Sequence, residues 1–131
     1  MIAVAGLTRS YGLRPVLRGI DFNAEAGSLT AIFGPNGTGK STFMRILATL
    51  VRPDGGQVSV AGYTLPGQSE PARGVIGAVL HATLLYSELS ADENLRFYAR
   101  LYDLEAPEKR IAELLERVGL TRRRRDPVRV F

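Results

Sequence analysis

The sequence contains the stretch Ala31-Ile32-Phe33-Gly34-Pro35-Asn36-Gly37-Thr38-Gly39-Lys40-Ser41-Thr42, an apolar run followed by a glycine-rich loop. The loop fits the pattern Gly-x-x-x-x-Gly-Lys-Ser/Thr, with Gly34 as its first glycine and Gly39 as its second. The residues after the loop are apolar at helical spacing, namely Phe43, Ile46, Leu47 and Leu50. A strand-like run, a glycine-rich loop and a helix in this order predict a phosphate-binding loop.

The residue types of this loop suit a polyphosphate. Glycines allow the backbone to approach a ligand closely, and the amino end of the following helix favours an anion. Lys40 would reach the β- and γ-phosphates, and the Ser41 hydroxyl would coordinate Mg²⁺. Thr42 would touch the α-phosphate or serve in capping the helix. The predicted nucleotide-binding residues are Gly34, Pro35, Asn36, Gly37, Thr38, Gly39, Lys40, Ser41 and Thr42, and the alternative is a plain glycine turn before a helix.

Composition is that of an ordinary globular protein. An apolar fraction of 45%, a charged fraction of 23% and a length of 131 residues fit one folded domain. Cysteine is absent, which excludes a disulfide framework and a thiolate metal site. The apolar start at Met1 lacks the basic lead of a secretory signal, and no apolar run approaches the roughly 18 residues that span a bilayer. We therefore expect a soluble, cytoplasmic protein that reaches a membrane only through a partner.

Positive charge is concentrated in one place. The net charge is +4, and four consecutive arginines, Arg122-Arg123-Arg124-Arg125, contribute much of it. Such a run could bind nucleic acid or anionic lipid, but no interleaved aromatic residue or reading element accompanies it. We expect the run to be solvated or to face a partner, and we expect no nucleic-acid partner.

The first part of the chain is predicted to contain strands and turns. We expect strands at residues 2–7, 16–23 and 28–33, with a polar loop at 8–12. The unbroken apolar centre of the third strand predicts burial on both of its faces. A helix over about residues 40–50 follows, and then the turn Pro53-Asp54-Gly55-Gly56 and a short antiparallel strand ending at Gly62. Residues 64–74 are predicted to form a surface loop, and the apolar run at 75–80 another strand.

Two helices are predicted in the last third of the chain. Ser90 and Glu93 have the spacing of a capping box, which starts a helix that extends to about Asp103. Its expected apolar face consists of Leu95, Tyr98, Leu101 and Tyr102. Pro107 opens a second helix that stops at Gly119, with Ile111, Leu114, Leu115 and Val118 as its expected buried stripe.

Taken together, these residues resemble the ATP-binding cassette of ABC transporters over the whole chain. Tyr11, in the stretch that leads to Val16-Leu17-Arg18-Gly19-Ile20, matches the family's aromatic residue that stacks on adenine, and the alternative is a tyrosine that only fills a loop. The resemblance implies an α/β fold: a P-loop NTPase (ABC ATPase) core with an antiparallel β-subdomain and part of the helical subdomain. It also implies ATP and Mg²⁺ as cofactors, with Ser41 as the metal ligand. Residues 1–131 would form a single partial ATP-binding domain, with 1–80 cradling the nucleotide and 81–131 starting the helical subdomain.

Within this family, one later stretch resembles a particular kind of subunit. Residues 81–102, and especially Glu93-Asn94-Leu95-Arg96-Phe97-Tyr98, are similar to the ATP-binding subunit of the haem exporter of cytochrome c biogenesis. Exporters of drugs or polysaccharides share the Glu-Asn-Leu helix and remain an alternative cargo class. The family's partners would be transmembrane permease subunits and a second cassette in a homodimer, which would place the chain on the inner face of the cell membrane.

The sequence departs from the family pattern in two places. Most cassettes carry a glutamine where this chain has Ala82, beside His81, so either His81 or a backbone carbonyl would substitute for its ligand atom. After Gly119 we find no Leu-Ser-Gly-Gly-Gln-like signature, no Asp-Glu pair after an apolar strand and no switch histidine. We therefore expect a cassette truncated before the signature, with no catalytic residue within the chain and no ATP turnover by it alone. The alternatives are a soluble ABC protein acting on ribosomes or DNA, and a non-catalytic fragment.

Overall fold

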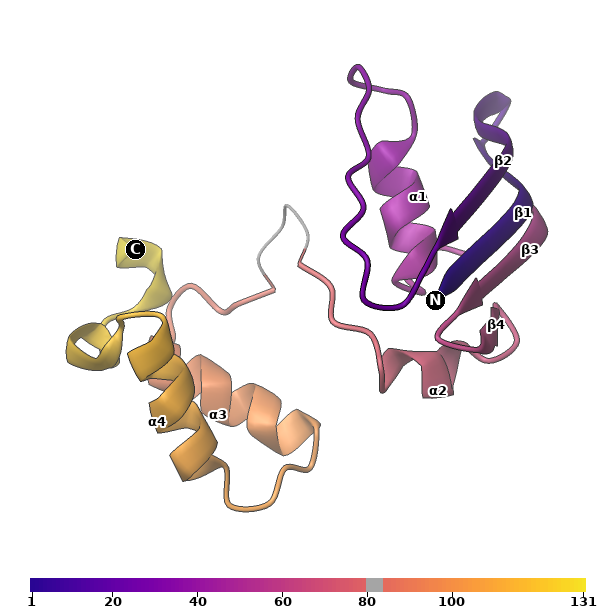
Figure 1. The fold of residues 1–131 in the computed structure, drawn as a ribbon. Helices are drawn as coiled ribbons and strands as arrows, with labels where there is room; N and C mark the ends of the chain where they lie inside the picture. Colours follow the sequence, from indigo (N-terminus) through magenta and orange to yellow (C-terminus); the bar gives the residue numbers. More distant parts are fainter. Residues whose placement is uncertain (80–83) are drawn as a thin grey trace. The chain divides into compact units, whose positions relative to one another are not determined.

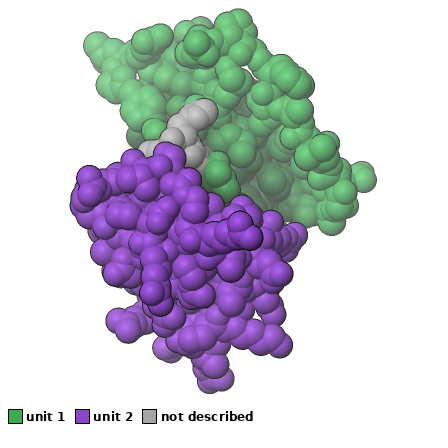
Figure 2. Space-filling model, turned by 90° about the vertical axis from the view of Figure 1, so that its left-hand side faces the viewer, with its two compact units in different colours: residues 1–79 green, residues 80–131 purple. Residues whose placement is uncertain are grey.

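The structure is a computed structural model that describes residues 1–79 and 84–131. Two compact units make up the chain, residues 1–79 and residues 80–131, which Figure 2 shows in green and purple. His81 and Ala82, the residues considered in place of the family's glutamine, lie outside the described residues.

The first unit contains a four-stranded antiparallel sheet (Figure 1). Its strands are β1 (Ile2–Tyr11), β2 (Arg14–Ala24), β3 (Gly55–Val60) and β4 (Tyr63–Leu65), in the spatial order β2-β1-β3-β4. In the register of the sheet, Val4 lies opposite Phe22 on β2 and opposite Val58 on β3. Alternate residues of a strand point to the same face, so these pairs direct apolar side chains toward one side of the sheet.

Helix α1 (Lys40–Leu47) packs against this apolar side. Its spacing brings Phe43, Ile46 and Leu47 onto one face, and all three are buried. They share a core with Val4, Leu7, Leu17, Val58, Val60, Leu65 and Ala72. Phe43 meets Phe22 edge to face, with ring centroids 5.3 Å apart. Burying each large apolar side chain contributes about 1.5–3 kcal/mol, so this core fixes the position of α1 on the sheet.

The second unit pairs helix α3 (Ala91–Leu101) with helix α4 (Pro107–Arg117), followed by two 3₁₀ turns, η1 (Thr121–Arg123) and η2 (Val128–Val130). Ala99, Ile111 and Leu115 form its small core. The predicted capping box is confirmed, since the Ser90 N–H donates to Glu93 Oε2 at 2.8 Å and the Glu93 N–H donates to Ser90 Oγ at 3.2 Å. Pro107 lies in the first turn of α4, as predicted.

Asn94 holds the segment before α3. Its side chain is 1% exposed, yet both polar atoms of its amide have partners. Oδ1 accepts from the Tyr86 N–H at 2.8 Å, and Nδ2 donates to the carbonyls of Tyr86, Leu89 and Ser90 at 3.0, 3.3 and 3.0 Å. One amide therefore supplies the hydrogen bonds that a short irregular segment needs when it lies against a helix.

The prediction of a strand at residues 28–33 is wrong. These residues have no regular secondary structure, and Leu29 and Phe33 are almost fully exposed. A strand exists through hydrogen bonds to its neighbours, and within the described ranges the sheet contains only β1 to β4. The same reason applies to residues 75–79, which also form no strand.

Several predicted boundaries also need correction. β1 continues through residues 8–11, because β2 pairs with it as far as Tyr11 and so extends the predicted strand into the predicted loop. The predicted loop at 64–74 contains the end of β4 and the short helix α2 (Ser69–Arg73), and α1 stops at Leu47. On α3 the buried residues are Asn94 and Ala99, whereas Leu101 and Tyr102 are exposed, as is Val118 after α4. Within the described ranges α4 is the helix that packs most extensively against α3, so α3 buries a narrow stripe.

Candidate functional site

The glycine-rich loop is anchored where it enters α1. Gly39 has φ of 94°, in the left-handed region that favours glycine, and caps the helix. A Cβ on Gly39 would stand 2.7 Å from Leu17 Cδ2 and 3.1 Å from the Val16 carbonyl oxygen. The absence of a side chain at Gly39 therefore lets the end of the loop lie directly on β2.

Lys40 folds back over the start of the loop. Its Nζ donates to the carbonyl oxygens of Gly34 and Pro35, both at 2.6 Å. The Thr38 hydroxyl donates to the same Pro35 carbonyl at 2.9 Å and closes the turn from the other side. An ammonium group has three donors, so one remains for a ligand while two hold the loop. The charge of Lys40 is thus kept at the loop by contacts within the loop itself.

The amino end of α1 differs from that of α3. The first helical backbone bond of α1 runs from the Phe43 N–H to the Gly39 carbonyl at 2.8 Å, so the N–H groups of residues 40–42 precede the helical ladder. No side chain caps this end, and its first turn holds no acidic residue. At α3, by contrast, Ser90 and Glu93 cap the end and Asp92 adds negative charge. The positive end of the α1 dipole is therefore open to an external anion.

The predicted side chains at the helix start have different exposures. Ser41 is exposed and Thr42 is half-buried. Because no side-chain hydrogen bond caps α1, the capping alternative for Thr42 has no support. Within the described ranges no group of three or more acidic or histidine side chains could hold a metal ion. A Mg²⁺ ion at Ser41 would fit this loop as a metal that takes its other ligands from phosphate oxygens and water.

Tyr11 lies at the same end of β2 as the loop. The hairpin register places Tyr11 opposite Arg14 and Arg9 opposite Leu17, and Gly39 rests on Val16 and Leu17. The Tyr11 side chain is 45% exposed. Tyr11 and the glycine-rich loop are separated in sequence. The fold brings both to the same end of the β1–β2 hairpin.

The acidic side chains near the start of α3 have structural partners. Asp92 accepts hydrogen bonds from Arg96 Nε at 2.8 Å and from Arg124, and the bond from Arg96 is the main cause that lowers the pKa of Asp92. Hydrogen bonds from Ser90 lower the pKa of Glu93. Both groups are therefore ionised and engaged within the second unit, which agrees with the capping role predicted for this stretch.

The arginine run is only partly available to a partner. Arg124 pairs with Asp92, and Arg123 Nε donates to Asp126 Oδ2 at 2.8 Å and places its guanidinium 4.3 Å from the Phe131 ring centroid. Arg122 and Arg125 are exposed. Arg123 is exposed as well, and only Arg124 is half-buried. The expected solvated or partner-facing run therefore needs correction at Arg124, because Asp92, distant in sequence, pairs with it.

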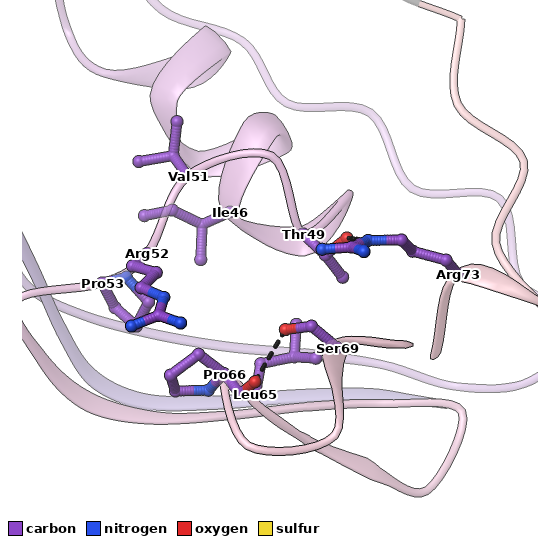
Figure 3. A pocket seen from close by; sticks show the side chains of 9 residues that line it. All are labelled: Ile46, Thr49, Val51, Arg52, Pro53, Leu65, Pro66, Ser69 and Arg73. Atoms are coloured by element: carbon purple, nitrogen blue, oxygen red, sulfur yellow. Dashed lines mark hydrogen bonds between the residues drawn. The ribbon is translucent and has the colours of Figure 1, made fainter. Parts of the chain in front are cut away.

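A small cavity lies away from the predicted site. It has a volume of about 80 Å³, and its lining comes from the end of α1, the turn before β3, the end of β4, and α2 (Figure 3). Arg73 Nε donates to Thr49 Oγ1 at 2.9 Å at its edge, and Ser69 Oγ donates to the Pro66 carbonyl at 2.8 Å. No residue of the glycine-rich loop lines it. The cavity holds a few waters at most and belongs to the packing of this corner.

None of the helices within the described ranges combines the length and apolarity needed to cross a bilayer.

The fold and the loop together define a class of nucleotide-binding domain, and comparison with known proteins gives the family. The family model described as "ABC transporter" matches residues 17–130. The chain belongs to the ABC transporter family. A solved structure titled "Structure of ATP binding subunit of ABC transporter" superposes with a TM-score of 0.81 and 32% identity, covering 97% of this chain and 54% of the other. The predicted family and the predicted fold class are confirmed.

The curated relatives are named for different functions. The linearmycin resistance ATP-binding protein LnrL of Bacillus subtilis (strain 168) is 38% identical over 133 residues, covering 100% of this chain and 43% of the relative. The daunorubicin resistance ATP-binding protein DrrA3 of Streptomyces coeruleorubidus is 36% identical, with 99% and 42% covered. The cytochrome c biogenesis ATP-binding export protein CcmA of Cupriavidus pinatubonensis (strain JMP 134 / LMG 1197) is 37% identical, with 95% and 55% covered. The chain thus spans about half the length of these relatives, and cytochrome c biogenesis is one of several functions named among them.

Sequence reasoning missed two residues of structural importance near these sites. Asp54 reaches the end of β1, where it binds Arg9 and the Ser10 N–H. Asn94 was assigned no role, although it is the most connected buried polar side chain of the second unit. A polar residue at a helical position otherwise occupied by apolar ones is the signal that could have identified Asn94.

Proposed function

We propose that this chain is the ATP-binding part of an ABC exporter subunit, and that residues 34–42 bind Mg-ATP. In this proposal the loop N–H groups and Lys40 bind the phosphates, Ser41 coordinates Mg²⁺ and Tyr11 stacks on adenine. The observation that carries the proposal is the uncapped, acid-free amino end of α1 beside the Lys40 ammonium. ABC ATPases bind ATP with Mg²⁺, and this end of α1 has the charge and the free donors that such a ligand requires.

The two units would have different tasks. Residues 1–80 would cradle the nucleotide, because the loop, α1 and Tyr11 all belong to this part. Residues 81–131 would begin the helical subdomain. We propose permease subunits and a second copy of the cassette as partners, and a position on the inner face of the cell membrane through the permease.

Lys40→Ala tests the phosphate site. Removing a charge-assisted hydrogen bond of this kind costs about 1.5–3 kcal/mol, which corresponds to a loss of roughly tenfold or more in affinity. Binding of a fluorescent ATP analogue is measured for the parent chain, for Lys40→Ala and for Lys109→Ala. Lys109 is an exposed lysine on α4 and controls for the change in net charge. Equal affinities of the parent and Lys40→Ala would refute the proposal.

Tyr11 variants test the base contact separately. Stacking of a base on an aromatic side chain is worth roughly 1–3 kcal/mol by alanine substitution in nucleic-acid systems, and adenine should behave similarly here. Tyr11→Phe keeps the ring and should bind ATP almost as the parent does, whereas Tyr11→Ala should bind it more weakly. If Tyr11→Ala retains the parent affinity, Tyr11 has no part in the site.

The cargo is proposed from the relatives. Haem export for cytochrome c biogenesis has the support of CcmA, and export of an antibiotic has the support of LnrL and DrrA3, which match nearly the whole chain. A deletion strain distinguishes the two. Loss of covalently bound haem from c-type cytochromes supports haem export, whereas increased sensitivity to a linearmycin- or daunorubicin-type compound with normal cytochromes supports antibiotic export.

A further inference from the structure

One face of the Tyr11 ring is covered by another side chain. The guanidinium carbon of Arg9, two residues earlier on β1, lies over the ring 5.0 Å from its centroid. At this distance a cation is attracted to the electron-rich face of an aromatic ring. The Arg9 side chain is 25% exposed, and Tyr11 keeps 45% of its surface exposed. One face of the ring is thus covered by a cation, while much of the side chain remains accessible.

Asp54 fixes Arg9 in this position. Its Oδ1 accepts from Arg9 Nη1 at 2.6 Å, its Oδ2 accepts from the Ser10 N–H at 2.6 Å, and its own N–H donates to the Thr8 carbonyl at 3.0 Å. Asp54 therefore binds three successive residues directly before Tyr11. Arg9 Nε is buried and has no hydrogen-bond partner among the described residues. Within this part of the chain, Asp54 is therefore the side chain that hydrogen-bonds the Arg9 guanidinium.

We propose that Arg9 is a positioning residue for the nucleobase, and that Asp54, Arg9 and Tyr11 together form a platform on which adenine stacks. Asp54 holds the guanidinium, the guanidinium holds the ring from one face, and the base occupies the exposed surface that remains. A ring already held in place loses less conformational freedom when a base stacks on it, so the platform gains affinity by pre-organisation. This inference rests on the proposed role of Tyr11 as the adenine contact.

The test compares a ligand that has a base with one that does not. Binding of ATP and of inorganic tripolyphosphate to the full chain is measured by calorimetry at fixed ionic strength. Arg9→Met keeps the aliphatic stem and removes the cation. Because Arg9 acts by holding the ring before the base arrives, Arg9→Met should weaken ATP binding about two- to fivefold and leave tripolyphosphate binding unchanged. Arg18→Met removes one positive charge from β2, opposite Thr8, and should match the parent for both ligands.

Two further variants connect Arg9 to its neighbours. Asp54→Asn removes the carboxylate charge that holds Arg9 and should reproduce the selective loss of ATP affinity. In a Tyr11→Ala background, Arg9→Met should have no additional effect on ATP binding, because the ring through which it acts is gone. Arg9→Lys keeps a cation without the planar fork and should fall between the parent and Arg9→Met, which provides a second measurement if circular dichroism shows that Arg9→Met is poorly folded.

The outcomes separate this inference from the proposed function. If Tyr11→Ala weakens ATP binding but Arg9→Met and Arg9→Lys do not, the platform is refuted and the base contact of Tyr11 stands. If Arg9→Met weakens ATP and tripolyphosphate equally, Arg9 acts through charge or folding and the inference is refuted. If Tyr11→Ala itself binds ATP like the parent, both the base contact and the platform are refuted.

Discussion

Gly39 and Leu17 are so close that a methyl group on Gly39 would stand 2.7 Å from Leu17 Cδ2. Leu17 is a buried member of the core on β2, and Gly39 is the last residue of the loop before α1. The glycine-rich loop is therefore held against the sheet by a contact that only glycine permits.

Gly39→Ala should destabilise the first unit. The left-handed backbone costs an alanine about 1–2 kcal/mol, and contact with Leu17 and the Val16 carbonyl adds to this cost. Gly37→Ala is a matched control, because Gly37 has φ of 84° but a Cβ there would meet nothing beyond its chain neighbours within 4 Å. Urea unfolding, monitored by circular dichroism, should show a larger loss of unfolding free energy for Gly39→Ala than for Gly37→Ala. Equal losses would mean that the backbone conformation alone matters.

The isolated chain should bind ATP without turning it over. Lys40 and Ser41 would bind the ground state as well as the transition state, and interactions of this kind give little acceleration. Of the carboxylates at the start of α3, Asp92 and Glu93 already have partners within the second unit. Phosphate release by purified residues 1–131 should stay at background. Release that is abolished by Lys40→Ala would show that this chain contains catalytic groups we have not recognised.

Asn94→Ala should destabilise the second unit by about 1–3 kcal/mol. The substitution leaves the Tyr86 N–H and the carbonyls that Asn94 binds without their partner, and an unsatisfied buried polar group costs this much. Thermal unfolding followed at a helix-sensitive wavelength measures the loss. Asn23→Ala, at an exposed position of β2, is the control and should change stability little. A loss as small as that of the control would indicate that water replaces the amide.

Stability of the second unit should fall in acid. Hydrogen bonds from Arg96 and Arg124 lower the pKa of Asp92 below its ordinary 3.8, and bonds from Ser90 lower the pKa of Glu93 below 4.5. A carboxylate with a lowered pKa in the folded state stabilises it at higher pH, and this stabilisation is lost as the pH falls below the ordinary values. The helices of the second unit should therefore unfold at a lower temperature below about pH 4 than at pH 7.

Asp92→Asn isolates the contribution of one carboxylate. The variant should be less stable than the parent at pH 7, where Asp92 is ionised, and the difference should shrink in acid, where Asp92 becomes protonated. Glu105→Gln, at an exposed position before α4, controls for the loss of one negative charge. A difference between Asp92→Asn and the parent that stays constant with pH would contradict this explanation.

Sequence patterns that span only a few residues were sufficient to predict several structural features. The capping box depends on Ser90 and Glu93, three residues apart, and the helix after Pro107 depends on apolar residues at helical spacing. Boundaries that depend on pairing were less accurate. The extension of β1 to Tyr11 follows from its register with β2, which is not visible in the local alternation of residues.

The sequence by itself determined the loop, its lysine and the helix that follows, because glycines, charge and helical periodicity act between near neighbours. Only the tertiary structure decided that residues 28–33 form no strand, since a strand needs hydrogen-bonded neighbours that the described residues do not supply. It also decided the surroundings of Tyr11. Arg9 and Asp54 are 45 positions apart, and a carboxylate acts on a guanidinium only when folding brings the two groups within a few ångströms.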